Sequence, residues 1–314
     1  MKKFILLLFV VYSSLSAFSQ DAGFTQYNAS RIYTNPAFAG TDSTLVLSAA
    51  YRIQWPKTDG GYKTIHFTAD QYIRFLRGGI GINYLNDNQL ETFKKTSIDL
   101  MYSRNIGLFK GKLRLCPAFQ ISYFKNTLDW SKLTFGDMID ARLGYVYNTN
   151  EQTNINSKSN IDFSAGLLLY TNHYYGGIAV HHLTQPDEGL LGISELPIKT
   201  TIHAGTNLSF KGDIDQKFIL SPNILYMKQK NFQTLMLGVT AKYKIIVLGL
   251  SYRNDDALII NGGIQNRFLK IGYSYDYTVS SLTNKATGGA HEIQLTWFLH
   301  YQKKMSNIKT LRLI

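Results

Sequence analysis

The sequence predicts an all-β protein, a transmembrane antiparallel β-barrel of about fourteen strands with a short segment before the first strand. Three observations support this fold class. A secretory signal opens the chain, apolar and polar residues alternate along segment after segment from Leu45 onward, and the number of these segments is even. Because lipid cannot satisfy the hydrogen-bonding groups of a free sheet edge, amphipathic strands that cross a membrane must close into a barrel.

The composition limits the class of protein. The 314 residues include 33 Lys and Arg against 21 Asp and Glu, a net charge of +12, and 21 Tyr, 18 Phe and 3 Trp, while only 17% of residues are charged. A chain this aromatic does not stay disordered. The single cysteine, Cys116, excludes an intramolecular disulfide framework and a cysteine-based zinc site. The aromatic residues are not interleaved with Lys/Arg clusters, so we expect no nucleic-acid partner.

Residues 1–19 have the pattern of a signal peptide. Lys2 and Lys3 precede the apolar run Phe4–Tyr12, and Ala17 stands three residues before the expected cleavage site, after Ser19. The apolar run is too short to span a bilayer. The residue directly after the cleavage site is Gln20 and not cysteine, so a lipoprotein anchor is not expected. The mature protein is therefore expected in the periplasm or the outer membrane.

Strict alternation predicts the strands. From Leu45 to Trp55 every second residue is apolar, which predicts one apolar and one polar face. The apolar face would comprise Leu45, Leu47, Ala49, Tyr51, Ile53 and Trp55, and the polar face Ser48, Arg52 and Gln54. The same period predicts fourteen strands, near 43–55, 61–74, 78–86, 93–104, 111–124, 160–171, 173–183, 198–211, 216–228, 232–243, 245–253, 257–266, 268–279 and 290–302.

Strand length and loop length both favour a membrane barrel over the alternative, a soluble periplasmic β-sandwich. Many segments exceed the roughly 5–6 residues of soluble strands and match the length of a tilted membrane-crossing strand. The long loops 125–160, 184–197 and 279–289 follow the fifth, seventh and thirteenth strands. All three would therefore lie at one end, as the extracellular loops of such barrels do.

Three motifs at the start of the expected mature chain resemble a known family. They are Phe24-Thr25-Gln26-Tyr27, then Asn35-Pro36-Ala37-Phe38-Ala39-Gly40, then Tyr51-Arg52-Ile53-Gln54-Trp55. In this order they resemble the PorP/SprF family, outer-membrane proteins of the type IX secretion system in Bacteroidetes. The resemblance continues at Gly78–Asp87, Ala179–Pro186 and His291–Leu295. It departs at Asp21-Ala22-Gly23, where the family often has Asp-Pro, and in the basic extension Gln302–Ile314.

The resemblance implies a non-enzymatic barrel in the outer membrane, without cofactor. Its implied partners are outer-membrane lipid and a secreted cargo protein, such as a large adhesin of gliding motility, recognised through a C-terminal sorting domain. A role in the core apparatus, with contacts to periplasmic ring components, is one alternative. A passive channel is another.

Four parts follow from this interpretation: the signal 1–19, an N-terminal segment 20–42, the barrel 43–302 and a basic tail 303–314. The N-terminal segment is expected either to plug the lumen or dock a periplasmic partner, or to clasp the barrel base. The tail either docks a periplasmic partner or is a frayed end. The candidate partner-binding residues are Phe24, Gln26, Tyr27, Asn35, Pro36, Lys303 and Lys304.

Other residue patterns predict no catalytic or metal site. His181 and His182 are adjacent on a strand, so their rings are expected on opposite faces, where they could not share a metal. Asp129, Asp137 and Asp140 lack the spacing of a calcium loop and predict a solvated loop. No Gly-x-Ser-x-Gly is present, and the adjacent Asp255 and Asp256 predict a turn. Glycines such as Gly78, Gly79 and Gly81 are expected to allow curvature or close packing.

Overall fold

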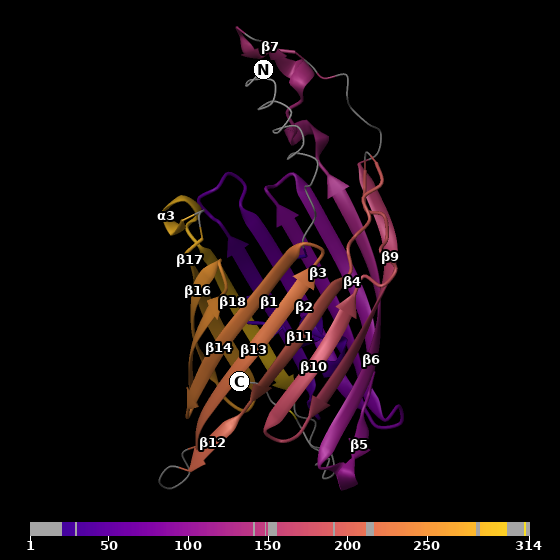
Figure 1. Ribbon diagram of the computed structural model, residues 1–314, viewed down its shortest axis with the longest axis vertical. Coiled ribbons are helices and arrows are strands. Elements are labelled where there is room, and N and C mark those ends of the chain that lie inside the picture. Colours follow the sequence, from indigo (N-terminus) through magenta and orange to yellow (C-terminus); the bar gives the residue numbers. More distant parts are fainter. Residues whose placement is uncertain are drawn as a thin grey trace.

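A computed structural model describes residues 21–28, 30–140, 142–147, 149, 156–190, 192–211, 217–280, 283–299 and 311. The chain forms a closed antiparallel barrel of fourteen strands, which confirms the predicted fold class (Figure 1). Its strands are β1 (Leu45–Gln54), β2 (Tyr62–Ile73), β3 (Gly78–Gln89), β4 (Phe93–Arg104), β6 (Leu113–Leu128), β9 (Ser157–Tyr170), β10 (Tyr174–His181), β11 (Lys199–Thr206), β13 (Lys217–Gln229), β14 (Phe232–Tyr243), β15 (Ile246–Arg253), β16 (Ala257–Gln265), β17 (Leu269–Thr278) and β18 (Ala290–Leu299).

Each of the fourteen strands pairs with the next one along the chain, and the pairing of the first strand with the last closes the ring. β1 pairs with β18, the last strand, and β11 pairs with β13. Two short strands, β5 (Ile106–Leu108) and β12 (Leu208–Lys211), extend the pairing of β6 and β13. The predicted eighth strand is thus divided between β11 and β12, and the predicted fifth strand continues to Leu128.

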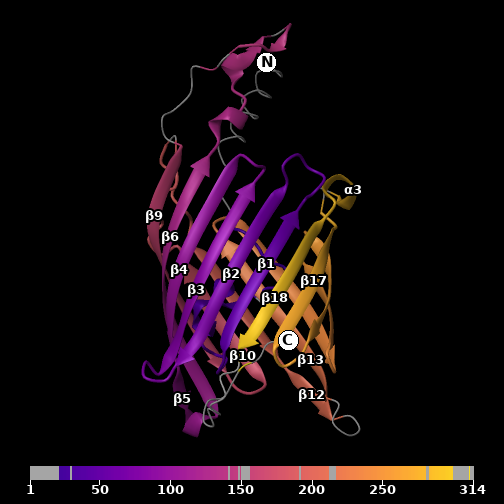
Figure 2. The same cartoon turned by 180° about the vertical axis from the view of Figure 1, so that it is seen from behind.

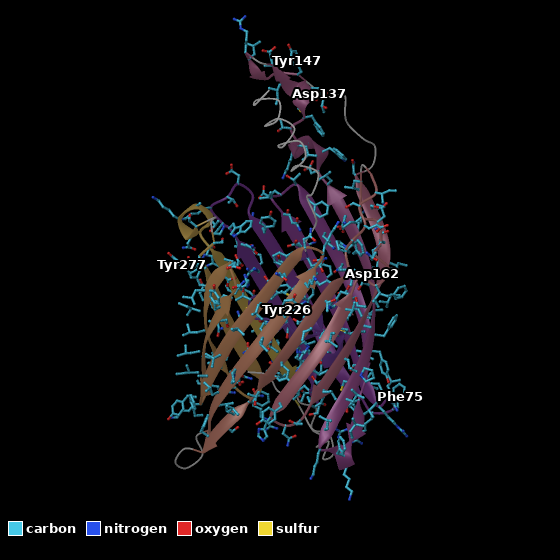
Figure 3. The ribbon with its side chains drawn as sticks, in the orientation of Figure 1. Phe75, Asp137, Tyr147, Asp162, Tyr226 and Tyr277 are labelled. Atoms are coloured by element: carbon cyan, nitrogen blue, oxygen red, sulfur yellow. The ribbon has the colours of Figure 1, made fainter. Side chains whose placement is uncertain are left out.

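Alternation along the strands separates an apolar outer face from a polar inner face. In β2, for example, Ile65 and Phe67 are exposed on the outside while Thr64 and His66 are buried inside. Figure 3 shows Tyr277 at the outer margin of the barrel. The reason is that outward side chains meet lipid whereas the lumen is lined by polar groups that bond to one another.

One face assignment was wrong, that of Trp55. The strand ends at Gln54, and Trp55 takes a left-handed backbone conformation with φ of 57°. Its N–H donates to the carbonyl of Gly289 at 2.8 Å. Because the backbone turns at this point, the alternation no longer applies, and the indole lines a cavity inside the barrel rim with Tyr62.

The long connections share one end of the barrel, as predicted, and we call this the loop end. It carries the loop between β6 and β9 with the small hairpin β7 (Ile139–Asp140) and β8 (Gly144–Tyr145), and also α3 (Asn284–Thr287) (Figures 1 and 2). The opposite end, the turn end, carries the shorter connections. In the described part of the chain, no helix is long and apolar enough to cross a membrane.

The described residues that precede β1 lie inside the barrel. We call Asp21–Thr44 the luminal segment. It contains one turn of helix, α2 (Arg31–Thr34), and the 3-10 turn η1 (Pro36–Phe38), and most of its side chains are buried. The hydrophobic clusters of the interior combine residues of this segment with inward-facing residues of the barrel wall.

Candidate functional site in the barrel lumen

The first motif, Phe24 to Tyr27, is held by the carboxylate of Glu292 on β18. The backbone N–H groups of Thr25 and Gln26 donate to its two oxygens at 2.7 and 3.0 Å. Glu292 is fully buried, with 0% exposure. A carboxylate that accepts two backbone N–H groups makes charge-assisted hydrogen bonds, so one side chain fixes the main chain of the segment.

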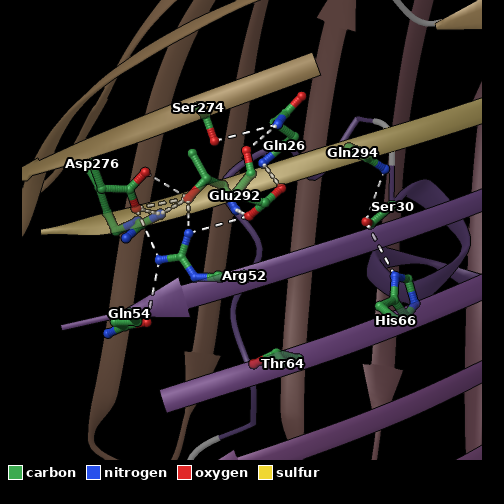
Figure 4. Close-up of polar contacts among 12 residues, drawn as sticks. Gln26, Ser30, Arg52, Gln54, Thr64, His66, Ser274, Asp276, Glu292 and Gln294 are labelled. Atoms are coloured by element: carbon green, nitrogen blue, oxygen red, sulfur yellow. Dashed lines mark hydrogen bonds and ion pairs between the residues drawn. The ribbon is translucent and has the colours of Figure 1, made fainter. Parts of the chain in front are cut away.

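Arg52 of the third motif joins the same network (Figure 4). Its guanidinium pairs with Asp276 at 3.0 Å and with Glu292 at 3.3 Å, and it also donates to the hydroxyl of Thr25. Arg253 pairs with Asp276 at 3.2 Å. These charges are buried, and such charges are tolerated only when they are paired and hydrogen-bonded. Two motifs that are far apart in sequence therefore meet at one buried ion cluster.

The N-terminal end of the luminal segment is bound near the loop end, at Asp21. His182 contacts Asp21 through Nε2 and Asp162 through Nδ1, both at 2.7 Å. Lys199 and Lys95 donate to Asp21 at 3.2 and 3.3 Å. Burial by itself would raise the pKa of Asp21, but His182, Lys199 and Lys95 together hold this pKa well below its usual range.

The same pairing acts on the histidine. Burial alone would lower the pKa of His182, but the carboxylates of Asp21 and Asp162 raise it above its ordinary value. The imidazole therefore holds its proton more strongly than a free histidine does. It forms a charged bridge between the luminal segment and the barrel wall.

The prediction that the rings of His181 and His182 point to opposite faces was wrong. β10 ends at His181, and His182 has φ of 61°, so the backbone turns between the two residues. Both rings lie on the inner side, with centroids 6.3 Å apart. His181 contacts the carbonyl of Thr34 at 3.3 Å. Sequence alternation missed this arrangement because it assumes a strand that continues.

Aromatic and polar contacts hold the segment between these charged clusters. Phe24 packs edge-on against Tyr33, with ring centroids 5.1 Å apart. The hydroxyl of Tyr27 donates to Asn223 at 2.6 Å. Ser30 lies within hydrogen-bonding distance of His66, at 3.4 Å, and receives a hydrogen bond from the Gln294 amide (Figure 4).

The second motif places Asn35 against the opposite wall of the barrel. Its amide donates to the carbonyls of Leu167 and Ile178 at 3.2 Å each, and its oxygen accepts from the N–H of Ala37. Asn35 has 0% exposure. A Cβ at Gly166 would lie 2.2 Å from the Asn35 oxygen, so only glycine leaves room for this contact.

Glycines on the inner wall also make room for the end of the motif. Gly40 has φ of 67°, and its backbone crosses β3 so closely that a Cβ at Gly79 would lie 2.1 Å from the carbonyl oxygen of Ala39. Arg31 pairs with Asp70 at 3.3 Å beside this crossing. The expected role of Gly79 in close packing thus has a definite partner, the luminal segment.

A cavity of about 320 Å³ lies between the N-terminal part of the luminal segment and the loop-end rim. Its wall is mixed, with three cations, three carboxylates, several amides and the rings of Trp55 and Tyr62. The charged residues of the wall are Asp21, Arg52, Asp87, Lys199, Arg253 and Asp256. We take the luminal segment and this cavity together as the candidate functional site.

The sequence-predicted candidates fall into two groups. Phe24, Gln26, Tyr27, Asn35 and Pro36 all belong to the luminal segment and contact the barrel wall or one another. Their binding of a partner stays a prediction. Lys303 and Lys304 lie outside the described residues, as do the predicted signal peptide and most of the tail. Within the tail, the described Leu311 is buried, and its N–H donates to the carbonyl of Thr41 at 3.2 Å.

The remaining predicted features are local structure. Asp255 and Asp256 form the turn between β15 and β16, as expected. Asp129 and Asp140 accept hydrogen bonds from nearby loop residues, and no group of three potential metal ligands occurs in the described part of the chain. Asp137 lies with Tyr147 in the extension beyond the loop end (Figure 3). Cys116 is buried in the core beside the luminal segment.

An apolar outer face, a polar lumen and a closed strand ring define a β-barrel membrane protein whose interior is occupied by its own N-terminal segment. The chain belongs to the type IX secretion system membrane protein family PorP/SprF, whose family model matches residues 16–297. The family and the fold together indicate the outer membrane. No curated protein matches the sequence.

Several solved structures resemble the chain in fold alone. The Acinetobacter baumannii outer membrane protein Omp33 is 7% identical with a TM-score of 0.43, over 83% of this chain and 100% of that one. The monoaromatic hydrocarbon channel CymD is 12% identical with a TM-score of 0.43, over 90% and 95% of the two chains. A mutant of the Rh. blastica porin is 6% identical with a TM-score of 0.35, over 81% and 98%.

Proposed function

We propose that this barrel is a non-enzymatic component of type IX secretion. It assists the export or surface anchoring of a cargo protein, such as a large adhesin, through the C-terminal sorting domain of that cargo. Membership of the PorP/SprF family supports a role in secretion. The choice of a cargo-binding role over a passive channel depends on one observation, the occupied lumen.

The lumen of a passive channel is expected to be an open, water-filled path. Here the luminal segment crosses the interior and is tied to the wall at Asp21, at Thr25 and at Asn35. These contacts are buried and polar, and buried polar groups are favourable only when they are hydrogen-bonded, so the contacts hold the segment in the lumen. A barrel whose interior is filled by contacts of its own luminal segment is better suited to bind a protein partner than to conduct solutes.

The test is purification in mild detergent from the native outer membrane, with an affinity tag after Ile314 and identification of every co-purifying protein. We expect one large secreted protein with a sorting domain. Recovery of periplasmic ring components instead would favour a core-apparatus role. Recovery of the barrel alone, with ion conductance in planar bilayers, would favour a passive channel and overturn the proposal.

A matched pair of variants tests whether cargo recovery depends on the luminal segment. Gly79→Ala introduces a methyl group where the luminal segment touches β3, whereas at Gly262 on β16 an added Cβ would meet nothing closer than 3.5 Å. If cargo recovery depends on the luminal segment, it falls with Gly79→Ala and stays at the wild-type level with Gly262→Ala.

A further inference from the structure

The loop-end cavity has an unmatched negative charge. Each cation in its wall is already paired with a carboxylate: Lys199 with Asp21 at 3.2 Å, Arg253 with Asp256 at 2.8 Å, and Arg52 with Asp276 at 3.0 Å. The remaining carboxylate of the wall is Asp87 on β3. Among the described residues, no cationic nitrogen lies within ion-pair distance of it.

Asp87 is 4% exposed, and both of its oxygens are held by neutral donors. The hydroxyl of Thr64 donates to one oxygen at 2.6 Å and the amide of Gln89 donates to the other at 2.8 Å. The nearby Lys95 is engaged by Asp21 at 3.3 Å and Glu188 at 3.7 Å. Burial of a carboxylate without a cation is unfavourable, and a cationic ligand in the adjacent cavity would remove that cost.

The rest of the wall suits a peptide. The amide nitrogen of Gln54 and the amide oxygen of Gln89, which are not the atoms that bond to Arg52 and Asp87, can pair with backbone groups. The rings of Trp55 and Tyr62, 5.4 Å apart and edge to face, can cover the aliphatic part of a long side chain or attract its charge. Arg52 also borders the cavity, and its Nε has no hydrogen-bond partner among the described residues. A volume of about 320 Å³ accommodates one such side chain with its adjoining backbone.

We propose that this cavity binds a lysine or arginine side chain of an extended peptide segment, with the cation paired to Asp87. The proposal rests on the proposed function in one respect, namely that the segment belongs to a protein partner of the barrel. The binding test below uses purified full-length barrel and synthetic peptides, so its failure is independent of what co-purifies from membranes.

The probes are the capped peptide acetyl-Gly-Ser-Lys-Ser-Gly-amide, the same peptide with Gln in place of Lys, and spermidine as a free amine, each titrated by calorimetry. We expect the Lys peptide to bind at least tenfold more tightly than the Gln peptide, because the Gln peptide cannot form the charge-assisted pair with Asp87. Binding should weaken as salt screens the pair. Stronger binding of spermidine than of the Lys peptide would assign the site to small amines and overturn the peptide assignment.

Variants of the barrel distinguish binding at Asp87 from a non-specific effect of the protein's net charge. Asp87→Asn should abolish the preference for Lys, and Asp87→Glu should retain it. Asp59→Asn removes the same charge at an exposed position in the loop after β1, outside the cavity wall, and should leave the preference intact. Unchanged preference in Asp87→Asn, or no binding of the Lys peptide to heat-modifiable wild-type barrel, would overturn the proposal.

Discussion

Glu292 on β18 binds the luminal segment through its main chain, accepting the N–H of Thr25 at 2.7 Å. The bond does not depend on which side chain stands at position 25, so its strength rests on the carboxylate alone. The carboxylate also forms an ion pair with Arg52, at 3.3 Å. The segment, β1 and β18 are therefore connected through a single buried group.

Replacing this carboxylate should destabilise the barrel. Glu292→Gln leaves Arg52 with one carboxylate fewer and turns an amide NH₂ toward two backbone N–H donors, so we expect a loss of about 3 kcal/mol. The measurement is the temperature at which the heat-modifiable band shifts on a gel. Glu91→Gln, which removes an exposed partner of Lys63, is the control and should leave that temperature unchanged. Equal shifts in both variants would contradict the role of Glu292.

Close packing at the turn end gives a second prediction. Gly79→Ala forces the Ala39 carbonyl away from β3, and overpacking of this kind costs about 1–3 kcal/mol. Thermal stability should fall accordingly in Gly79→Ala, while Gly262→Ala should match the wild type. A wild-type melting temperature in Gly79→Ala would mean that the segment does not depend on this crossing.

The bridge at Asp21 should depend on pH. The pKa of Asp21 is lowered, so its contribution is present above about pH 3.9 and is lost as the pH falls through the folded value. The pKa of His182 is raised, so its contribution is complete below about pH 6.5 and is lost as the pH rises through the folded value. We therefore expect the bridge to be strongest between about pH 4 and 6.5.

Hydrogen exchange measures this dependence. Protection of the amides of residues 22–28, corrected for intrinsic rates, should decrease from pH 6 to pH 9, whereas protection near Gly40 should stay constant. In His182→Asn the decrease should disappear, because the titrating imidazole is gone while Lys95 and Lys199 still pair with Asp21. A decrease that persists in this variant would assign it to another group.

Removing the luminal segment should open the lumen. A chain that lacks residues 21–40 but keeps residues 1–20 should show a higher ion conductance in planar bilayers than the full chain. The reason is that the buried contacts at Thr25 and Asn35 are lost with the segment. Equal conductance of the two proteins would mean that other residues close the path. Heat-modifiable mobility on a gel serves as the control for folding of the shortened barrel.

Periodicity predicted the barrel well because lipid on one side and polar groups on the other act on every strand residue. It predicted all fourteen strands and the shared end of the long loops. It failed for Trp55 and His182, each just beyond a strand end, where a positive φ redirects the side chain. Alternation has no information about a residue at which the chain leaves the sheet.

The candidate site was only partly predictable, for a related reason. The motif residues Thr25, Asn35 and Arg52 stood out in the sequence, but their contacts join segments that are separated along the chain: Arg52 donates to Thr25, and Asn35 donates to the carbonyl of Leu167. Asp87 ends one stretch of the family resemblance but was not predicted as a site residue, since a polar residue on the inner face of a strand is expected everywhere in a barrel. Its significance depends on which cations its neighbours have already bound.

The position of Glu292 opposite Arg52 also bears on how the barrel closes. These two residues are direct partners in the pairing of β1 with β18, the first and last strands of the ring. A slip of two residues at this seam would keep every side chain on its proper face, yet it would move the two apart by about 7 Å. Thr25 would then lose the carboxylate held in place by Arg52. The binding of the luminal segment thus depends on the correct register between β1 and β18. Closure of the barrel and occupation of its lumen are therefore coupled during assembly.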